Sequence, residues 1–120
     1  MRKINLAEKF SLFHEHWRPK IIDEANAYDF KLVRIKGAFL FHSHNDADET
    51  FLCWRGAMRV ETHDAIFHLN EGEMVTVPAG VEHRTAADEE ALVMIIAPKG
   101  LKNTGDKDDP RLTAPIGERI

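Results

Sequence analysis

Between Lys20 and Pro98 the chain consists of short runs of β-forming residues, each ended within a few positions by residues that favour turns. The helices that connect parallel strands do not fit between these runs, so the strands are expected to pair antiparallel. This pattern predicts an all-β fold, either a sandwich or a barrel. The predicted strands are residues 20–23, 28–35, 38–44, 50–61, 65–70, 73–77 and 91–97.

The two ends of the chain have different patterns. From Leu6 to Trp17 the apolar residues recur at helical spacing, which predicts a short amphipathic N-terminal helix. The residues Lys99–Ile120 are rich in Gly, Pro and charge, which predicts an irregular tail that is either draped over the body or disordered. We therefore expect a single domain over residues 1–120, with its core at about residues 20–98.

Composition limits the partners and the location of the protein. The formal net charge of -4 gives no electrostatic basis for binding nucleic acid. No apolar run approaches the roughly 18 residues that cross a bilayer, and the N-terminus lacks the features of a secretory signal, so we expect a cytoplasmic protein without a membrane partner. Cys53 is the only cysteine, so any metal must be held by nitrogen and oxygen ligands.

The densest group of possible metal ligands begins at His42. His42 and His44 are two residues apart, so on a strand their side chains project from the same face. Glu49 follows a polar turn and could add a carboxylate oxygen to the two imidazoles. Asp46 and Asp48 could compete with Glu49, but we interpret them as turn residues. Taken alone, a His-x-His pair is more often two surface histidines than a metal site.

Two spaced patterns resemble the conserved motifs of the cupin family. Residues 37–56 read G-x4-H-x-H-x4-E-x6-G, which is one residue shorter in its first gap than the family motif. Residues 72–87 read G-x5-P-x-G-x2-H-x3-A, where the second family motif ends in Asn instead of Ala87. Two motifs in the right order are much more specific than either alone.

This resemblance covers about half of the chain, Gly37 to Ile96, and implies a fold and a site. The implied fold is a cupin jelly-roll β-sandwich or barrel, similar to the mannose-6-phosphate isomerase-like small cupins, with a mononuclear metal site. By position in the motifs, the implied ligands are His42, His44, Glu49 and His83. They would bind one divalent ion, and this donor set suits iron, manganese, nickel, cobalt and zinc alike.

The resemblance leaves two classes of function open, beside the possibility of a cupin whose metal site is empty in the cell. One is a metalloenzyme that acts on a small molecule, by sugar or sugar-phosphate isomerisation or by oxygen-dependent chemistry. The other is a non-catalytic cupin that binds or senses a small ligand such as a sugar. Proton transfer needs an inward-facing acid or base besides Glu49, and the sequence offers no clear candidate.

Both faces of the strands around the predicted ligands are apolar. Alternation places Phe51 and Cys53 on the inner face with Glu49, where Phe51 could wall a pocket. The outer face would then carry Phe39, Phe41, Leu52 and Trp54. Such a face needs a cover, which could be the N-terminal helix, a second sheet or a second subunit. We expect the protein to be a homodimer.

Overall fold

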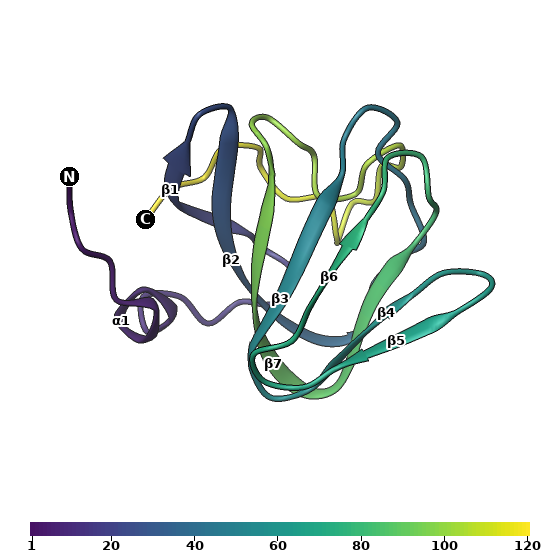
Figure 1. The fold of residues 1–120 in the computed structure, drawn as a ribbon, viewed down its shortest axis with the longest axis horizontal. Coiled ribbons are helices and arrows are strands. Elements are labelled where there is room, and N and C mark those ends of the chain that lie inside the picture. Colours follow the sequence, from purple (N-terminus) through teal and green to yellow (C-terminus); the bar gives the residue numbers. More distant parts are fainter.

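The computed structural model describes residues 1–120 and confirms an all-β fold with one short helix (Figure 1). No helix in it has the length and apolar character that crossing a membrane requires. In chain order the elements are α1 (Leu6–Phe10), β1 (Lys20–Ala25), β2 (Tyr28–Ala38), β3 (Glu49–Arg55), β4 (Met58–Glu61), β5 (Ile66–Leu69), β6 (Met74–Val77) and β7 (Arg84–Pro98).

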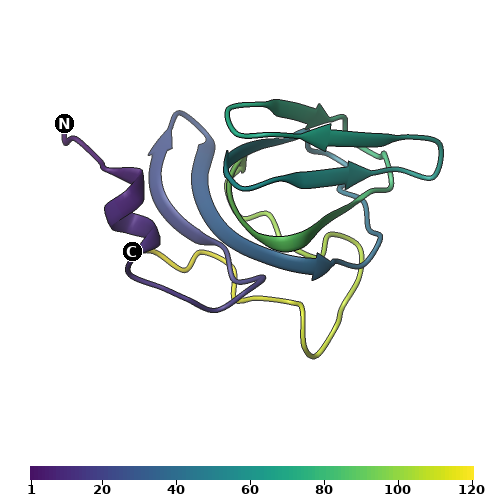
Figure 2. The same ribbon diagram turned by 90° about the horizontal axis from the view of Figure 1, so that it is seen from below.

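The long strand β7 organises the sheet. Its 15 residues pair antiparallel with β2 along their length, with β4 at the N-terminal end and with β3 at the C-terminal end. The strand order β1-β2-β7-β3-β6, with β5 joined through β4, makes one sheet of seven strands. Figure 2 shows this sheet curling around an interior, which is the predicted jelly roll.

The inner face of the curled sheet carries the main core, a cluster of 13 buried residues. In β3 the side chains alternate as predicted: Phe51 and Cys53 are buried inside, and Leu52 and Trp54 are half-buried on the outer face. A smaller cluster covers part of that outer face, where Phe10 and Phe13 of the N-terminal segment are buried together with residues of β1 and β2. Sheet curvature and alternation together therefore create the enclosed interior.

The N-terminal helix is much shorter than the predicted span from Leu6 to Trp17. It ends after Phe10, because the Arg34 guanidinium donates hydrogen bonds to the carbonyls of Phe10 and Phe13, at 2.9 Å each. A continued helix would need the Phe10 carbonyl for its own backbone hydrogen bond. Trp17 instead adopts a left-handed conformation, with φ of 64°.

Two strand predictions are wrong in the middle of the chain. The predicted strand 38–44 does not form, because β2 ends at Ala38 and only an isolated bridge follows at His42. The predicted break at residues 88–90 lies inside β7, where three residues bulge opposite one residue of β2. Glu90 in this bulge accepts a hydrogen bond from Arg34, so its charge is satisfied within a strand and does not mark a turn.

The C-terminal tail is irregular, as predicted, and is draped over the body. It returns from the end of β7 to β1 (yellow in Figure 1). At its far end, the Ile21 N–H donates to the Glu118 carbonyl at 2.7 Å, and the Ile120 N–H donates to the Ile21 carbonyl at 3.1 Å. On the way, the Asp106 N–H donates to the Ser43 carbonyl at 3.1 Å, so the tail contacts the segment that carries the predicted ligands.

Candidate metal centre

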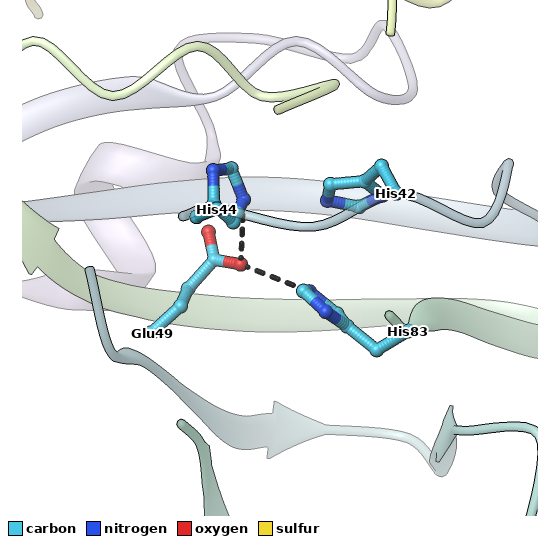
Figure 3. A group of neighbouring side chains, drawn as sticks. All are labelled: His42, His44, Glu49 and His83. Atoms are coloured by element: carbon cyan, nitrogen blue, oxygen red, sulfur yellow. Dashed lines mark hydrogen bonds and ion pairs between the residues drawn. The ribbon is translucent and has the colours of Figure 1, made fainter. Parts of the chain in front are cut away.

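The four side chains implied by the motifs converge inside the barrel. Figure 3 shows His42, His44, Glu49 and His83 pointing toward one another. One ligand atom from each residue lies within 4.8 Å of the others, and all four residues are buried. Two ligand atoms on opposite sides of one ion, at about 2.1 Å each, would be about 4.2 Å apart. The cluster is therefore close to the size of a single coordination sphere.

No strand forms around His42 and His44, and isolated backbone hydrogen bonds position the candidate ligands instead. The His42 N–H donates to the His83 carbonyl at 3.0 Å, and the His83 N–H donates back at 2.9 Å. The Gly80 N–H donates to the His44 carbonyl at 2.9 Å. The Asp48 carboxylate accepts the Ala79 N–H at 2.9 Å, which agrees with its interpretation as a turn residue. These bonds tie the two sequence motifs together.

Two of the imidazoles are oriented by carbonyls of their own chain segments. The Nδ1 atom of His42 donates to the Leu40 carbonyl at 3.0 Å, and Nδ1 of His83 donates to the Val81 carbonyl at 2.9 Å. A carbonyl only accepts, so both Nδ1 atoms carry a proton and the Nε2 atoms are left for the cluster. Such partners fix the ring orientation and tautomer of metal-binding histidines. Sequence reasoning missed this support.

Glu49 carries the negative charge of the cluster. Burial alone would raise the pKa of its carboxyl group, but the close contacts and charges of His44 and His83 outweigh burial and lower the pKa to about 2. Nε2 of His83 lies 3.2 Å from the Glu49 Oε1 atom, and this contact raises the His83 pKa although burial opposes the shift. Burial lowers the His42 pKa to about 4, so that ring is neutral at pH 7.

The residues present fit a divalent cation. Nε2 of His44 is buried, and its polar contact is with the Glu49 Oε1 atom at 3.3 Å, an ion-pair distance without good hydrogen-bond geometry. A bound cation would satisfy this nitrogen atom. Three imidazole nitrogens and one carboxylate oxygen are ligands that first-row divalent metals accept, and they leave positions open for a small molecule in six-coordination.

A small cavity of about 30 Å³ adjoins His42 and Glu49, with room for about one or two water molecules. Phe51 lines it, as the alternation of β3 predicted. Phe39 also lines it and stacks near Trp17, with ring centroids 4.9 Å apart. The expectation that Phe39 lies on the outer face is therefore wrong, because the chain turns inward after β2 ends.

Sequence reasoning missed two charged residues inside the barrel. Asp29 and Lys31 are buried in β2, on the same side of the strand as Val33 and Ile35. The Lys31 ammonium donates a long hydrogen bond, 3.5 Å, to the Leu101 carbonyl of the tail. The signal was present in the sequence, because period-two alternation from the inward-facing Val33 and Ile35 puts both charges on the buried face.

The tail forms part of the wall of this centre. A surface groove of about 290 Å³ runs between residues 43–47 and the tail at 100–106, and His44 and Leu101 both line it. Gly105 makes the closest approach: a Cβ atom there would lie 2.3 Å from the Ser43 carbonyl oxygen and 2.9 Å from Cδ2 of His42. The tail therefore covers one side of the candidate site.

Comparisons with known proteins agree with this geometry. The family model of the Cupin domain matches residues 32–98, which is just over half of the chain. A cupin-2 domain containing protein from Shewanella frigidimarina is 46% identical, with a TM-score of 0.79 over 80% of this chain and 94% of that one. A protein from Neisseria meningitidis is 28% identical, with a TM-score of 0.75 over 82% of this chain and 100% of that one.

More distant structures share the fold alone. The hydroquinone 1,2-dioxygenase PnpCD, in complex with Cd²⁺ and 4-hydroxybenzonitrile, is 17% identical, with a TM-score of 0.66 over 77% of this chain and 70% of that one. No protein with a curated description matches the chain. The family-model match, the 46% identical structure and the jelly roll agree, and the chain belongs to the cupin family.

Proposed function

We propose that the chain is a single-domain, metal-binding cupin in which His42, His44, Glu49 and His83 hold one divalent ion of iron, manganese, nickel, cobalt or zinc. The observation that carries this proposal is the convergence of four buried ligand atoms within 4.8 Å. The buried Nε2 of His44, which has no well-formed hydrogen bond, also supports it. We further propose that the protein is a metalloenzyme acting on a small molecule.

A divalent ion bound there would supply Lewis acidity toward a carbonyl or hydroxyl oxygen, or a binding position for oxygen. The protein residues prepare the site for this. The carbonyls of Leu40 and Val81 hold the rings of His42 and His83, and Glu49 contributes the negative charge of the ligand set. Phe39 and Phe51 keep the adjoining cavity apolar, which limits the access of bulk water.

A non-catalytic ligand-binding cupin is the alternative, and the interior of the barrel favours the enzyme. Lys31 and Asp29 supply the inward-facing acid and base, besides Glu49, that proton transfer requires. The 30 Å³ cavity is far too small for a sugar phosphate, which supports oxygen-dependent chemistry over isomerisation at that position. A larger ligand would have to approach through the groove beside His44.

Metal content tests the site directly. Protein purified without chelator is expected to contain close to one divalent ion per chain by elemental analysis, and His42→Ala and His83→Ala are expected to lose it. His68→Ala is the matched control, because His68 is exposed on β5, outside the cluster. Unchanged metal content in the His42 and His83 variants would eliminate the proposed ligands.

We also propose that the protein is a homodimer. The smaller apolar cluster around Phe10 and Phe13 includes Leu32 and contacts Trp54. Leu52 and Ile96 lie outside this cluster on the same outer face. Met74, which pairs with Leu52 from β6, is 60% exposed. Apolar side chains left partly or fully exposed on one face of a sheet are typical of subunit interfaces. Sedimentation equilibrium at micromolar concentration is expected to give the dimer mass, and a monomer would refute the proposal.

A further inference from the structure

The barrel holds two buried charged residues beyond the four candidate ligands. Asp29 is 2% exposed and Lys31 is 8% exposed, and both project from β2 into the interior. Charged side chains are almost never buried to this degree unless they are paired or bind something. Their surroundings therefore decide what they do.

Neither residue has its bonding capacity filled. The Asp29 Oδ1 atom has no hydrogen-bond partner although it is buried. The Lys31 ammonium has three donors and makes one long bond, to the Leu101 carbonyl at 3.5 Å. Native proteins satisfy nearly all buried polar groups. The Asp29 carboxylate can still accept a hydrogen bond and the Lys31 ammonium can still donate, which points to a ligand with both a donor and an acceptor.

Strand register places this pair beside the candidate metal centre. Lys31 pairs with Ile95, which pairs on its other side with Phe51, so Lys31 and Phe51 lie two strand spacings apart, about 10 Å. Ala97 pairs with Asp29, and continuation of the β3 register puts Glu49 on the other side of Ala97, so only this small side chain stands between Asp29 and Glu49 on the inner face. The charges of Glu49 and Asp29 both act on Lys31, opposing the lowering of its pKa by burial.

Charge balance indicates the kind of ligand. With a divalent ion bound and the imidazoles neutral, the ion and Lys31 bring three positive charges, and Glu49 and Asp29 bring two negative charges. One positive charge then remains uncompensated in a buried site, where unpaired charge is strongly unfavourable. A single negative charge on the ligand removes it. Carboxylate is the simplest such group, and it accepts hydrogen bonds from an ammonium.

A surface groove lies beside both the metal centre and the bonding partner of Lys31. The groove of about 290 Å³ is lined by His44 on one side and by Leu101, the bonding partner of Lys31, on the other. A molecule in this groove would contact His44 and Leu101, whereas Lys31 and Asp29 are buried behind its wall. The groove is near the lower size limit of small-molecule sites, which favours a ligand of few atoms.

We propose that Lys31 and Asp29 form a subsite for a small hydroxycarboxylate, in which the Lys31 ammonium binds the carboxylate and Asp29 accepts a hydrogen bond from the hydroxyl. The subsite rests on the proposed function, because the bound metal supplies the charge that the carboxylate balances. It assigns a substrate class, small monoanionic hydroxy acids, to the metal site.

Calorimetric titration of nickel-loaded protein with lactate tests this subsite, with propanoate and 1,2-propanediol as probes that lack the hydroxyl and the carboxylate. Lactate is expected to bind more tightly than either. Lys31→Met should weaken lactate binding by at least about tenfold, the usual contribution of a hydrogen bond to a charged group, and leave the nickel content unchanged. Asp29→Asn should abolish the preference for lactate over propanoate.

The outcomes separate the two proposals. If the wild-type protein binds none of the five candidate ions, the proposed function fails and the subsite fails with it; if it binds one of them but not nickel, the titration is made with that ion. If nickel binds and Lys31→Met retains the wild-type affinity for lactate, the subsite alone is refuted. Thermal unfolding of each variant checks folding. Should Lys31→Met not fold, the double variant Asp29→Asn and Lys31→Met removes both buried charges, an exchange that proteins often tolerate, and must also lose lactate binding.

Discussion

Gly105→Ala is expected to destabilise the protein and disturb the candidate metal centre, although Gly105 lies in the irregular tail. The backbone there has φ of 56°, a conformation that residues with a Cβ atom rarely adopt. The added methyl carbon would lie 2.3 Å from the Ser43 carbonyl oxygen. Two non-bonded atoms cannot remain at that distance, so the tail must move away from Ser43.

The expected loss follows from the contacts that would break. A left-handed conformation costs an alanine about 1 to 2 kcal/mol. Separation from Ser43 also breaks the hydrogen bond from the Asp106 N–H to the Ser43 carbonyl, 3.1 Å, and that from the Ser43 N–H to the Asp106 carboxylate, 2.9 Å. At about 1 kcal/mol each, these bring the total to about 3 to 4 kcal/mol.

Gly100→Ala is the matched control. Gly100 lies in the same tail with φ of 79°, but a Cβ atom there would meet nothing within 4 Å. The control should lose only the conformational contribution, about 1 to 2 kcal/mol. Urea denaturation, with a slope of about 1.5 kcal/mol per molar, should therefore place the midpoint for Gly105→Ala about 1.3 M below that for Gly100→Ala.

Metal affinity provides a second measurement on the same two variants. The Gly105 methyl would also lie 2.9 Å from Cδ2 of His42, so the ring must shift. Loss of support around a ligand typically weakens metal binding about 10-fold to 100-fold. Equal midpoints for the two variants, together with equal metal affinity, would show that the tail does not press on the centre as described.

Three further predictions concern other parts of the centre. Trp17 lines the cavity and Trp54 packs on the outer face. Ni²⁺ should therefore quench the fluorescence of Trp54→Phe, which keeps only Trp17, much more than that of Trp17→Phe, which keeps only Trp54; equal quenching would contradict this placement. Cys53 is fully buried and its thiol pKa is raised by burial, so a thiol reagent should react only at the rate of unfolding, and fast labelling of folded protein would count against it. The His42 pKa is lowered from 6.5 to about 4 in the folded chain, so without metal the unfolded chain takes up a proton there at a higher pH than the folded chain does. Acidification from pH 7 to pH 4 should therefore lower the free energy of unfolding by about 3 kcal/mol through His42. Urea titrations at both pH values should show that His42→Gln lacks this contribution.

The fold and the four candidate ligands were predictable because their signals are local. Alternation and turn residues defined the strands, and the spacing of the motifs selected His42, His44, Glu49 and His83 from a chain with seven histidines. The predicted strand at 38–44 was wrong, yet the side chains still converge. The paired backbone bonds between His42 and His83 replace the strand, and they depend on a segment about 40 residues away that no local pattern reveals.

The role of the tail was not predictable from its own residues. Gly105 is one of seven glycines, and nothing near it in the sequence marks it as the one that contacts Ser43. Lys31 is an intermediate case. Alternation in β2 predicts that its side chain points inward. Its hydrogen-bond partner, the Leu101 carbonyl, lies 70 residues later in the sequence and meets it only in the folded chain.

The path of the tail also separates the ligands from their cover along the sequence. The ligands lie between residues 42 and 83, inside a continuous set of strands, whereas the cover comes from residues 100–106 and is anchored where Glu118 bonds to Ile21 near the opposite end of the chain. The segment that would bind the ion and the segment that covers it are therefore distinct. A truncation or substitution in the tail changes access to the site while all four ligands stay in the chain.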